Sequence, residues 1–144
     1  MTSAPRLTIR RPVVVMARVT PALREELKRE IRGRLERLEM EMKQLDLQEK
    51  RLLGAPESRE QGKSQHIEQE LLRQRSARRS EMRELLVRER QVEELALGST
   101  IRRGTVDAEA EIGPGDRLDD LMGWELVVED GVVVEIRKGE GGSP

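Results

Sequence analysis

Hydrophobic residues recur at helical spacing in two long stretches of the chain. From Thr20 to Leu53 they follow one another mostly at three- or four-residue steps, and from Ser64 to Leu97 the same spacing returns with one gap. Residues on one face of an α-helix recur at this interval. The pattern therefore predicts two long helices of nearly equal length, separated by a short segment rich in Gly, Pro and Ser.

The first of these stretches carries signals at both of its ends. Thr20 suits a helix start because its hydroxyl can accept a hydrogen bond, and Pro21 fits the first turn, where no backbone N–H is needed. Gly54 and Pro56 stop the helix. With a tip at residues 54–63, the two helices are expected to fold back on each other as an antiparallel coiled-coil hairpin over residues 20–97.

The contact seam of this predicted hairpin is incomplete. In the first helix the apolar residues follow a heptad pattern from Leu35 onward, except where Glu49 takes a core position. In the second helix the stripe fails between Leu71 and Met82, where the sequence is rich in arginine. Matching the two arms about the tip places this polar stretch opposite residues 35–38. Either long arginine side chains cover the apolar surface there, or a partner does.

Both ends of the chain read as strands. The β-branched stretch from Leu7 to Val19 and the alternating apolar residues from Thr100 to Ile112 predict two strands. Pro12 favours an edge position or a bulge in the first of them. Farther on, β-branched runs flank Asp130-Gly131, a pair that favours a tight β-hairpin because glycine takes positive φ freely. Strand structure is therefore expected on both sides of the helices.

A turn and a single helical turn are predicted between Ile112 and Trp124. Gly113-Pro114-Gly115 is typical of a turn, and Asp116 can cap the short helix that follows it. Because two or three strands are marginal alone, we expect the N-terminal strand to join the C-terminal ones. The predicted fold class is thus α+β. The long antiparallel coiled-coil helical hairpin is inserted in a small, mostly antiparallel β-sheet or partial barrel formed by residues 6–19 and 99–138, with a disordered tail at 139–144.

Composition narrows the functional classes. The chain has 28 acidic and 27 basic residues, a net charge of −1 and 38% charged residues, which is typical of long helices. The absence of cysteine excludes disulfides and thiolate sites. One Trp without Phe or Tyr argues against modules that bind RNA by base stacking. No stretch approaches the roughly 18 apolar residues of a membrane span, so no membrane is expected and cytoplasmic is the expected location.

No catalytic, cofactor or metal site is predicted. His66 is the only histidine, and without cysteine it cannot form an ordinary zinc site. Asp116, Asp119 and Asp120 fit the start of a short helix better than an acid–base pair. The segment EIGPGDRL lacks the spacing of a phosphate-binding loop. We therefore expect no enzyme activity, no cofactor and no small-molecule substrate.

Two groups of helix residues are candidate interaction sites. The first is an arginine group on the second helix that could reach phosphates, in RNA or the ribosome. It contains Arg73, Arg75, Arg78, Arg79 and Arg83. The second is an apolar group on the first helix, lying partly off the seam, which an antiparallel pair of helices cannot bury together with the seam. It contains Met40, Met42 and Leu47, and it predicts self-association as a homodimer or docking of a partner helix.

The order of these features resembles the YlqD family of uncharacterised bacterial proteins. The resemblance rests on the Thr-Pro-x-Leu helix start at Thr20–Leu23 and on VVEDGVVVEIR at Val127–Arg137, and it covers about residues 7–138. It implies a cytoplasmic bacterial protein, and it brings no catalytic residue with it. The architecture is also similar to that of prefoldin-like chaperones, whose helical arms grip unfolded chains, although apolar tip residues are few here.

The leading functional prediction is a non-enzymatic interaction or scaffold protein whose coiled-coil hairpin mediates self-association or partner-protein binding. An RNA- or ribosome-associated factor that uses the arginine group is one alternative, and a prefoldin-like chaperone is another. The partner and the biological process are left open by the sequence.

Overall fold

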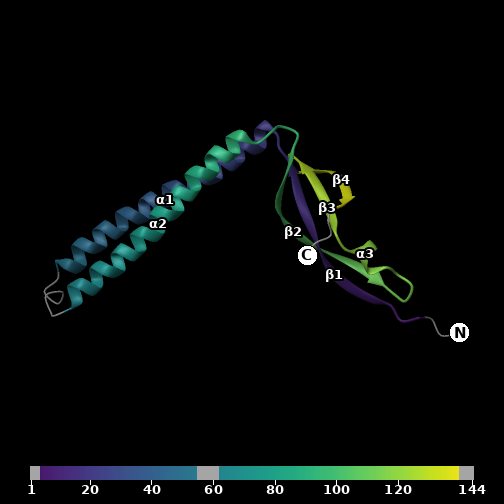
Figure 1. Ribbon diagram of the computed structural model, residues 1–144, viewed down its shortest axis with the longest axis horizontal. Coiled ribbons are helices and arrows are strands. Elements are labelled where there is room, and N and C mark those ends of the chain that lie inside the picture. The colour runs from purple at the N-terminus through teal and green to yellow at the C-terminus, as the bar shows by residue number, and fades with distance from the viewer. Residues whose placement is uncertain (1–3, 55–61, 140–144) are drawn as a thin grey trace. The chain divides into compact units, whose positions relative to one another are not determined.

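A helical hairpin and a four-stranded sheet make up the protein (Figure 1). The computed structural model describes residues 4–54 and 62–139. The elements follow in the order β1 (Leu7–Arg18), α1 (Pro21–Leu53), α2 (Lys63–Glu94), β2 (Thr100–Ile112), α3 (Leu118–Leu121), β3 (Trp124–Glu129) and β4 (Val132–Lys138). The predicted α+β class is confirmed, with the hairpin inserted between the segments that form the sheet.

Two compact units divide the chain. One consists of Met1–Leu23 with Leu95–Pro144, and the other of Arg24–Glu94. The expected hairpin tip lies mostly outside the described residues, since 55–61 are not described, and so does the expected tail from residue 140 onward.

The sheet has the strand order β2-β1-β3-β4. β1 pairs antiparallel with β2 and parallel with β3, while β3 and β4 form an antiparallel hairpin. The sheet is therefore mixed and open, and it does not close into a barrel. The connection from β2 to β3 contains α3 and is longer than a tight turn. It places β3 on the other side of β1 from β2, so that β3 runs parallel to β1.

Pro12 lies in an inner strand, although the sequence favoured an edge or a bulge for it. It pairs with Asp107 of β2 on one side. The parallel partner β3 pairs with β1 only from Val14 to Ala17. At Pro12, β1 therefore has a paired strand on one side only, so the proline lies at a local edge of the sheet, where proline is tolerated.

An irregularity in β2 brings its apolar residues onto one face of the sheet. The register of β1 with β2 shifts between Val15 and Met16, which leaves Arg103 as the extra residue of β2. Residues that pair across antiparallel strands point to the same face. Ile101, which pairs with Ala17, therefore shares a face with Val106, which pairs with Val13.

The turn between β3 and β4 has the expected form. Glu129 pairs with Val132, so Asp130 and Gly131 alone form the connection, with φ of 48° and 85°. Positive φ at both central residues is the geometry that Asp-Gly favours in a two-residue hairpin turn. The predicted hairpin is confirmed.

Helix α1 begins where the sequence predicted. The N–H of Leu23 donates a hydrogen bond of 3.1 Å to Oγ1 of Thr20, so the threonine caps the first turn that Pro21 opens. The same hydroxyl donates to Oδ1 of Asp130 at 2.6 Å. One side chain therefore connects the start of α1 to the β3–β4 turn.

The end of α2 differs from the expectation. The helix stops at Glu94, before the expected end at Leu97. Residues after Glu94 form the turn into the sheet: Gly98, at φ 86°, donates its N–H to the carbonyl oxygen of Val19 at 2.9 Å. A backbone hydrogen bond to the residue that follows β1 therefore takes the place of a further helical turn.

Asp116 does not cap α3 as expected. Its Oδ2 accepts a hydrogen bond of 2.8 Å from the N–H of Gly113 and so closes the preceding turn. The residue at the N-cap of α3 is Arg117, whose side chain makes no capping hydrogen bond. The carboxylate is therefore used in the turn before α3, three residues back in the chain, and not at the start of the helix.

Candidate interaction site

The two helices of the hairpin meet through an aliphatic seam interrupted by charged groups. Its buried side chains are Ile31, Leu35, Leu38 and Leu45 of α1 and Leu71, Leu85 and Val92 of α2. Leu38 is fully enclosed, with 0% of its surface exposed. The gap that the sequence showed between Leu71 and Met82 is occupied by side chains that form ion pairs between the helices.

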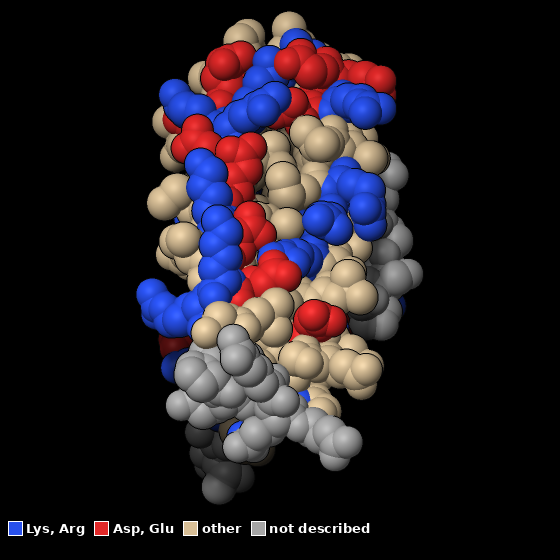
Figure 2. Space-filling model, turned by 90° about the vertical axis from the view of Figure 1, so that its left-hand side faces the viewer, with Lys and Arg blue, Asp and Glu red and all other residues tan. Residues whose placement is uncertain are grey.

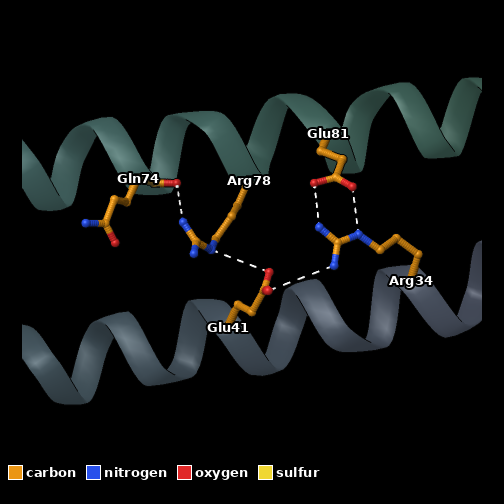
Figure 3. A network of polar contacts seen from close by, with 5 residues as sticks. All are labelled: Arg34, Glu41, Gln74, Arg78 and Glu81. Carbon is orange, nitrogen blue, oxygen red and sulfur yellow. Dashed lines mark hydrogen bonds and ion pairs between the residues drawn. The ribbon is translucent and has the colours of Figure 1, made fainter.

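The centre of this gap holds a network of charged groups (Figure 3). The Arg34 guanidinium donates from Nε and Nη2 to the two carboxylate oxygens of Glu81 at 2.7 and 2.9 Å. Glu41 forms ion pairs with Arg78 at 3.5 Å and with Arg34 at 3.9 Å. Arg78 also donates to the carbonyl oxygen of Gln74 at 3.1 Å. We call Arg34, Glu41, Arg78 and Glu81 the central polar layer.

A second set of ion pairs lies nearer the tip. Arg75 pairs with Asp46 at 2.9 Å and with Glu49, which is the residue that interrupted the predicted heptad pattern of α1. The Arg75 side chain is only 18% exposed. The carboxylate in the seam is therefore matched by an arginine from the opposite helix.

These contacts shift the protonation of the groups involved. The hydrogen bond from Arg34 lowers the pKa of Glu81 below its usual value, and the same bond raises the pKa of Arg34. The hydrogen bond to Glu49 likewise raises the pKa of Arg75. Each of these shifts favours the charged form of its own group, Glu81, Arg34 or Arg75, at neutral pH.

The central polar layer specifies the alignment of the two helices. An aliphatic seam alone tolerates sliding by one heptad, because leucine would again meet leucine. After such a slide Arg34 would face Arg88 or Gln74 in place of Glu81, and Glu41 would face Leu85 or Leu71. A carboxylate against leucine loses its hydrogen bonds. The polar stretch therefore has a structural role within the hairpin.

The five predicted arginines do not form one shared surface. Arg75 and Arg78 reach across to acidic residues of α1. Arg73 pairs with Glu70 at 3.2 Å, and Arg83 donates to Oγ of Ser80 at 3.1 Å. Arg79 is exposed. In the upper and middle parts of the face drawn in Figure 2, basic side chains lie beside acidic ones.

The predicted apolar residues of α1 separate into two environments. Met42 is half-buried between the levels of Leu38 and Leu45 in the seam. Met40 and Leu47 are 58% and 62% exposed, and they lie one heptad apart on the outer side of the helix. Each of them keeps more than half of its surface exposed, so among the described residues no side chain of α2 buries them.

Gly33 belongs to the same outer line of α1, although the sequence analysis did not single it out. It lies one heptad before Met40, and a Cβ added to it would have only Nη1 of Arg37 nearby, at 3.7 Å. A glycine inside a helix costs about 1 kcal/mol relative to alanine, so its presence was a signal that could have been used. We call Gly33, Met40 and Leu47 the outer strip of α1.

Other predicted positions form no chemical site. His66 is exposed near the start of α2, and Asp119 and Asp120 are exposed in α3. In residues 4–54 and 62–139 no group of three or more His, Cys, Asp or Glu side chains is arranged to hold a metal ion. Within the same ranges no helix is both long enough and apolar enough to span a membrane.

Comparisons with known proteins find a matching family model and a similar solved structure. The family model described as YlqD protein matches residues 7–137. A crystal structure of a protein of unknown function from Synechococcus sp. WH 8102 is similar, with 30% sequence identity and a TM-score of 0.83. The match covers 94% of this chain and 99% of the Synechococcus chain. Among curated proteins the comparison finds no match.

Proposed function

The chain belongs to the YlqD family, and we propose that it is a non-enzymatic interaction protein that self-associates through the outer strip of α1. The observation that carries this proposal is the exposure of Met40 and Leu47, at 58% and 62%, on a helix whose inner seam is already occupied. Aliphatic side chains aligned at one-heptad spacing provide a surface for another helix.

A second copy of α1 fits this strip in antiparallel orientation. With Met40 against Met40 of the second copy, the heptad spacing brings Leu47 of each chain opposite Gly33 of the other. The large side chain then meets the position that has no side chain. Such pairing of a protruding residue with a small one allows two helices to approach closely.

The charges beside the strip support the same arrangement. In an antiparallel pair, residues on one flank of a helix meet residues on the same flank of the other. On one flank Glu36 meets Lys43 of the second copy, and on the other Glu30 meets Arg51. Both contacts occur twice by symmetry. The contact of Arg29 with Lys50 is repulsive, so attractive contacts outnumber repulsive ones.

Binding of RNA has less support from the arrangement of side chains. Two of the five arginines, Arg75 and Arg78, are held in ion pairs with α1, at 18% and 28% side-chain exposure. Releasing either would break contacts that align the hairpin. Only Arg73, Arg79 and Arg83 are left on the outside, and a few exposed cations bind phosphate weakly.

A single cysteine tests the self-association. Because the chain has no cysteine, Met40→Cys introduces the only thiol. Met40 lies on the proposed symmetry axis, so under mild oxidation we expect this variant to form a disulfide-linked dimer. Leu72→Cys is the matched control, since Leu72 is 60% exposed on the outer side of α2.

Light scattering over a wide concentration range gives the second measurement. We expect the M40E/L47E variant to have a lower mass than the parent chain, because the charges prevent burial of the strip. A parent mass that stays monomeric at every concentration would reject the proposal. Equal cross-linking of the two cysteine variants would also reject it, because the strip would then have no preference.

A further inference from the structure

Strand β4 exposes apolar side chains at an edge of the sheet. Val132, Val133, Val134 and Ile136 are 63%, 51%, 46% and 64% exposed. In the order β2-β1-β3-β4, β4 has a neighbour on one side only. Within residues 4–54 and 62–139, no strand pairs with the backbone N–H and C=O groups on its other side. An exposed apolar edge strand is a template for pairing with another strand.

We propose that β4 pairs antiparallel with β4 of a second copy, about a two-fold axis at Ile136. This contact lies in the sheet unit and is separate from the outer strip of α1, so it does not depend on the function proposed above. It joins two sheets edge to edge into one continuous sheet.

A bulge in β4 limits the number of its residues that can pair with a second copy. Val127 pairs with Glu135 and Val128 with Val133, which leaves Val134 as the extra residue of β4. Beyond this bulge the side chains no longer alternate in step with a straight partner strand. Regular pairing between two copies of β4 is therefore restricted to residues 134–138.

Charge selects one register within this stretch. A symmetric antiparallel pair places one residue opposite itself, and opposite residues share a face. An axis at Glu135 would place two carboxylates opposite each other, and an axis at Arg137 would place two guanidinium groups together. An axis at Ile136 places isoleucine against isoleucine and, on both sides of it, Glu135 against Arg137 of the second copy. Only this register pairs opposite charges.

The other edge of the sheet lacks this complementarity. In β2 the residues Asp107, Glu109 and Glu111 alternate along one face, since they pair with alternate residues of β1. Any symmetric pairing centred among them places acidic side chains opposite acidic side chains, which is destabilising. β4 is therefore the edge suited to a second copy.

A covalent trap suits a pairing of only a few residues, because so small an interface holds a dimer together only at high protein concentration. Ile136→Cys places the only thiol of the chain on the proposed axis, where directly opposite residues approach closely enough for a disulfide. Val132→Cys is the control, because Val132 is equally exposed in the same strand but lies away from the axis. We expect at least a tenfold faster disulfide dimerisation for I136C than for V132C.

Charge reversal gives an independent measurement. The E135R/I136C chain has arginine on both sides of the axis, and the I136C/R137E chain has glutamate on both sides. Like charges then face each other when either chain pairs with itself, so each chain alone should lose the I136C cross-link. When the E135R/I136C and I136C/R137E chains are mixed, both cross-strand pairs again join opposite charges, and a mixed disulfide dimer should form. Circular dichroism checks that each chain is folded, since Arg137 also contacts Glu125 within one chain at 3.3 Å.

Two results would overturn the proposal. The first is an I136C rate no greater than that of V132C. The second is a mixture of folded reversal variants that cross-links no faster than either variant alone. Cross-linking through Met40→Cys does not bear on either result, so failure here and failure of the hairpin contact are separate outcomes.

Discussion

At the scale of single residues, Thr20 links two parts of the sheet unit with one hydroxyl. It accepts from the N–H of Leu23 and donates to Oδ1 of Asp130. The acceptor role requires only a threonine or serine before the helix, and it was visible in the sequence. The donor role depends on where the β3–β4 turn lies, which no local pattern around Thr20 contains.

Replacing this hydroxyl should lower stability by a measurable amount. We expect Thr20→Ala to reduce the free energy of unfolding by about 1 kcal/mol, because the first turn of α1 loses its side-chain cap. Thr20→Ser keeps the hydroxyl and should retain most of that free energy. Denaturant unfolding followed by circular dichroism gives both values. An equal loss in the two variants would show that the methyl group, and not the hydroxyl, matters.

At the scale of elements, the central polar layer makes the hairpin sensitive to acid. The folded chain holds the pKa of Glu81 below its usual value. A group with a lowered pKa contributes stability that is fully present above its unfolded-state pKa and is lost as the pH falls through the folded-state pKa. The pairing of Arg34 with Glu81 therefore weakens in the acid range.

Glu81→Gln tests this pH dependence. We expect the variant to be less stable than the parent at neutral pH, and the difference to shrink toward zero as the pH falls through the acid range. Glu84→Gln, three positions along α2 on an exposed side, is the control and should show little difference at any pH. Unfolding curves at several pH values measure it. A difference that stays constant with pH would contradict the assigned role of the carboxylate.

Local patterns predicted most of the elements, because their signals lie within a few residues. The Asp130-Gly131 turn and the start of α1 at Pro21 follow from such signals. The end of α2 was misplaced because Gly98 bonds to Val19, far away in the chain. The apolar group on α1 was found, but the sequence analysis did not separate half-buried Met42, which lies beside the seam, from exposed Met40, which lies on the opposite side of the helix.

At the scale of the whole molecule, two different symmetric contacts on one chain have a joint consequence. The outer strip of α1 and the edge of β4 belong to different compact units. A single symmetric contact closes a pair and stops there, whereas two different ones link pairs into larger closed or open assemblies. If both proposals hold, the parent chain should therefore grow beyond a dimer with concentration.

Sedimentation of combined variants measures this growth. We expect M40E/L47E to stop at a dimer held by β4, and R137E to stop at a dimer held by α1. The M40E/L47E/R137E chain should be a monomer. If either partial variant is already monomeric at the highest concentration, the two contacts do not form independently.

The position of the central polar layer also bears on how the arm can change length. Arg34, Glu41, Arg78 and Glu81 align the helices where they lie, and the ion pairs of Arg75 with Asp46 and Glu49 lie between them and the tip. Suppose that seven residues are inserted into α1 between Glu49 and the tip, and seven into α2 between the tip and Leu71. Every ion pair of the layer then still lies opposite its partner. The arm therefore tolerates extension in matched heptads, and homologous chains with longer hairpins would keep the same alignment.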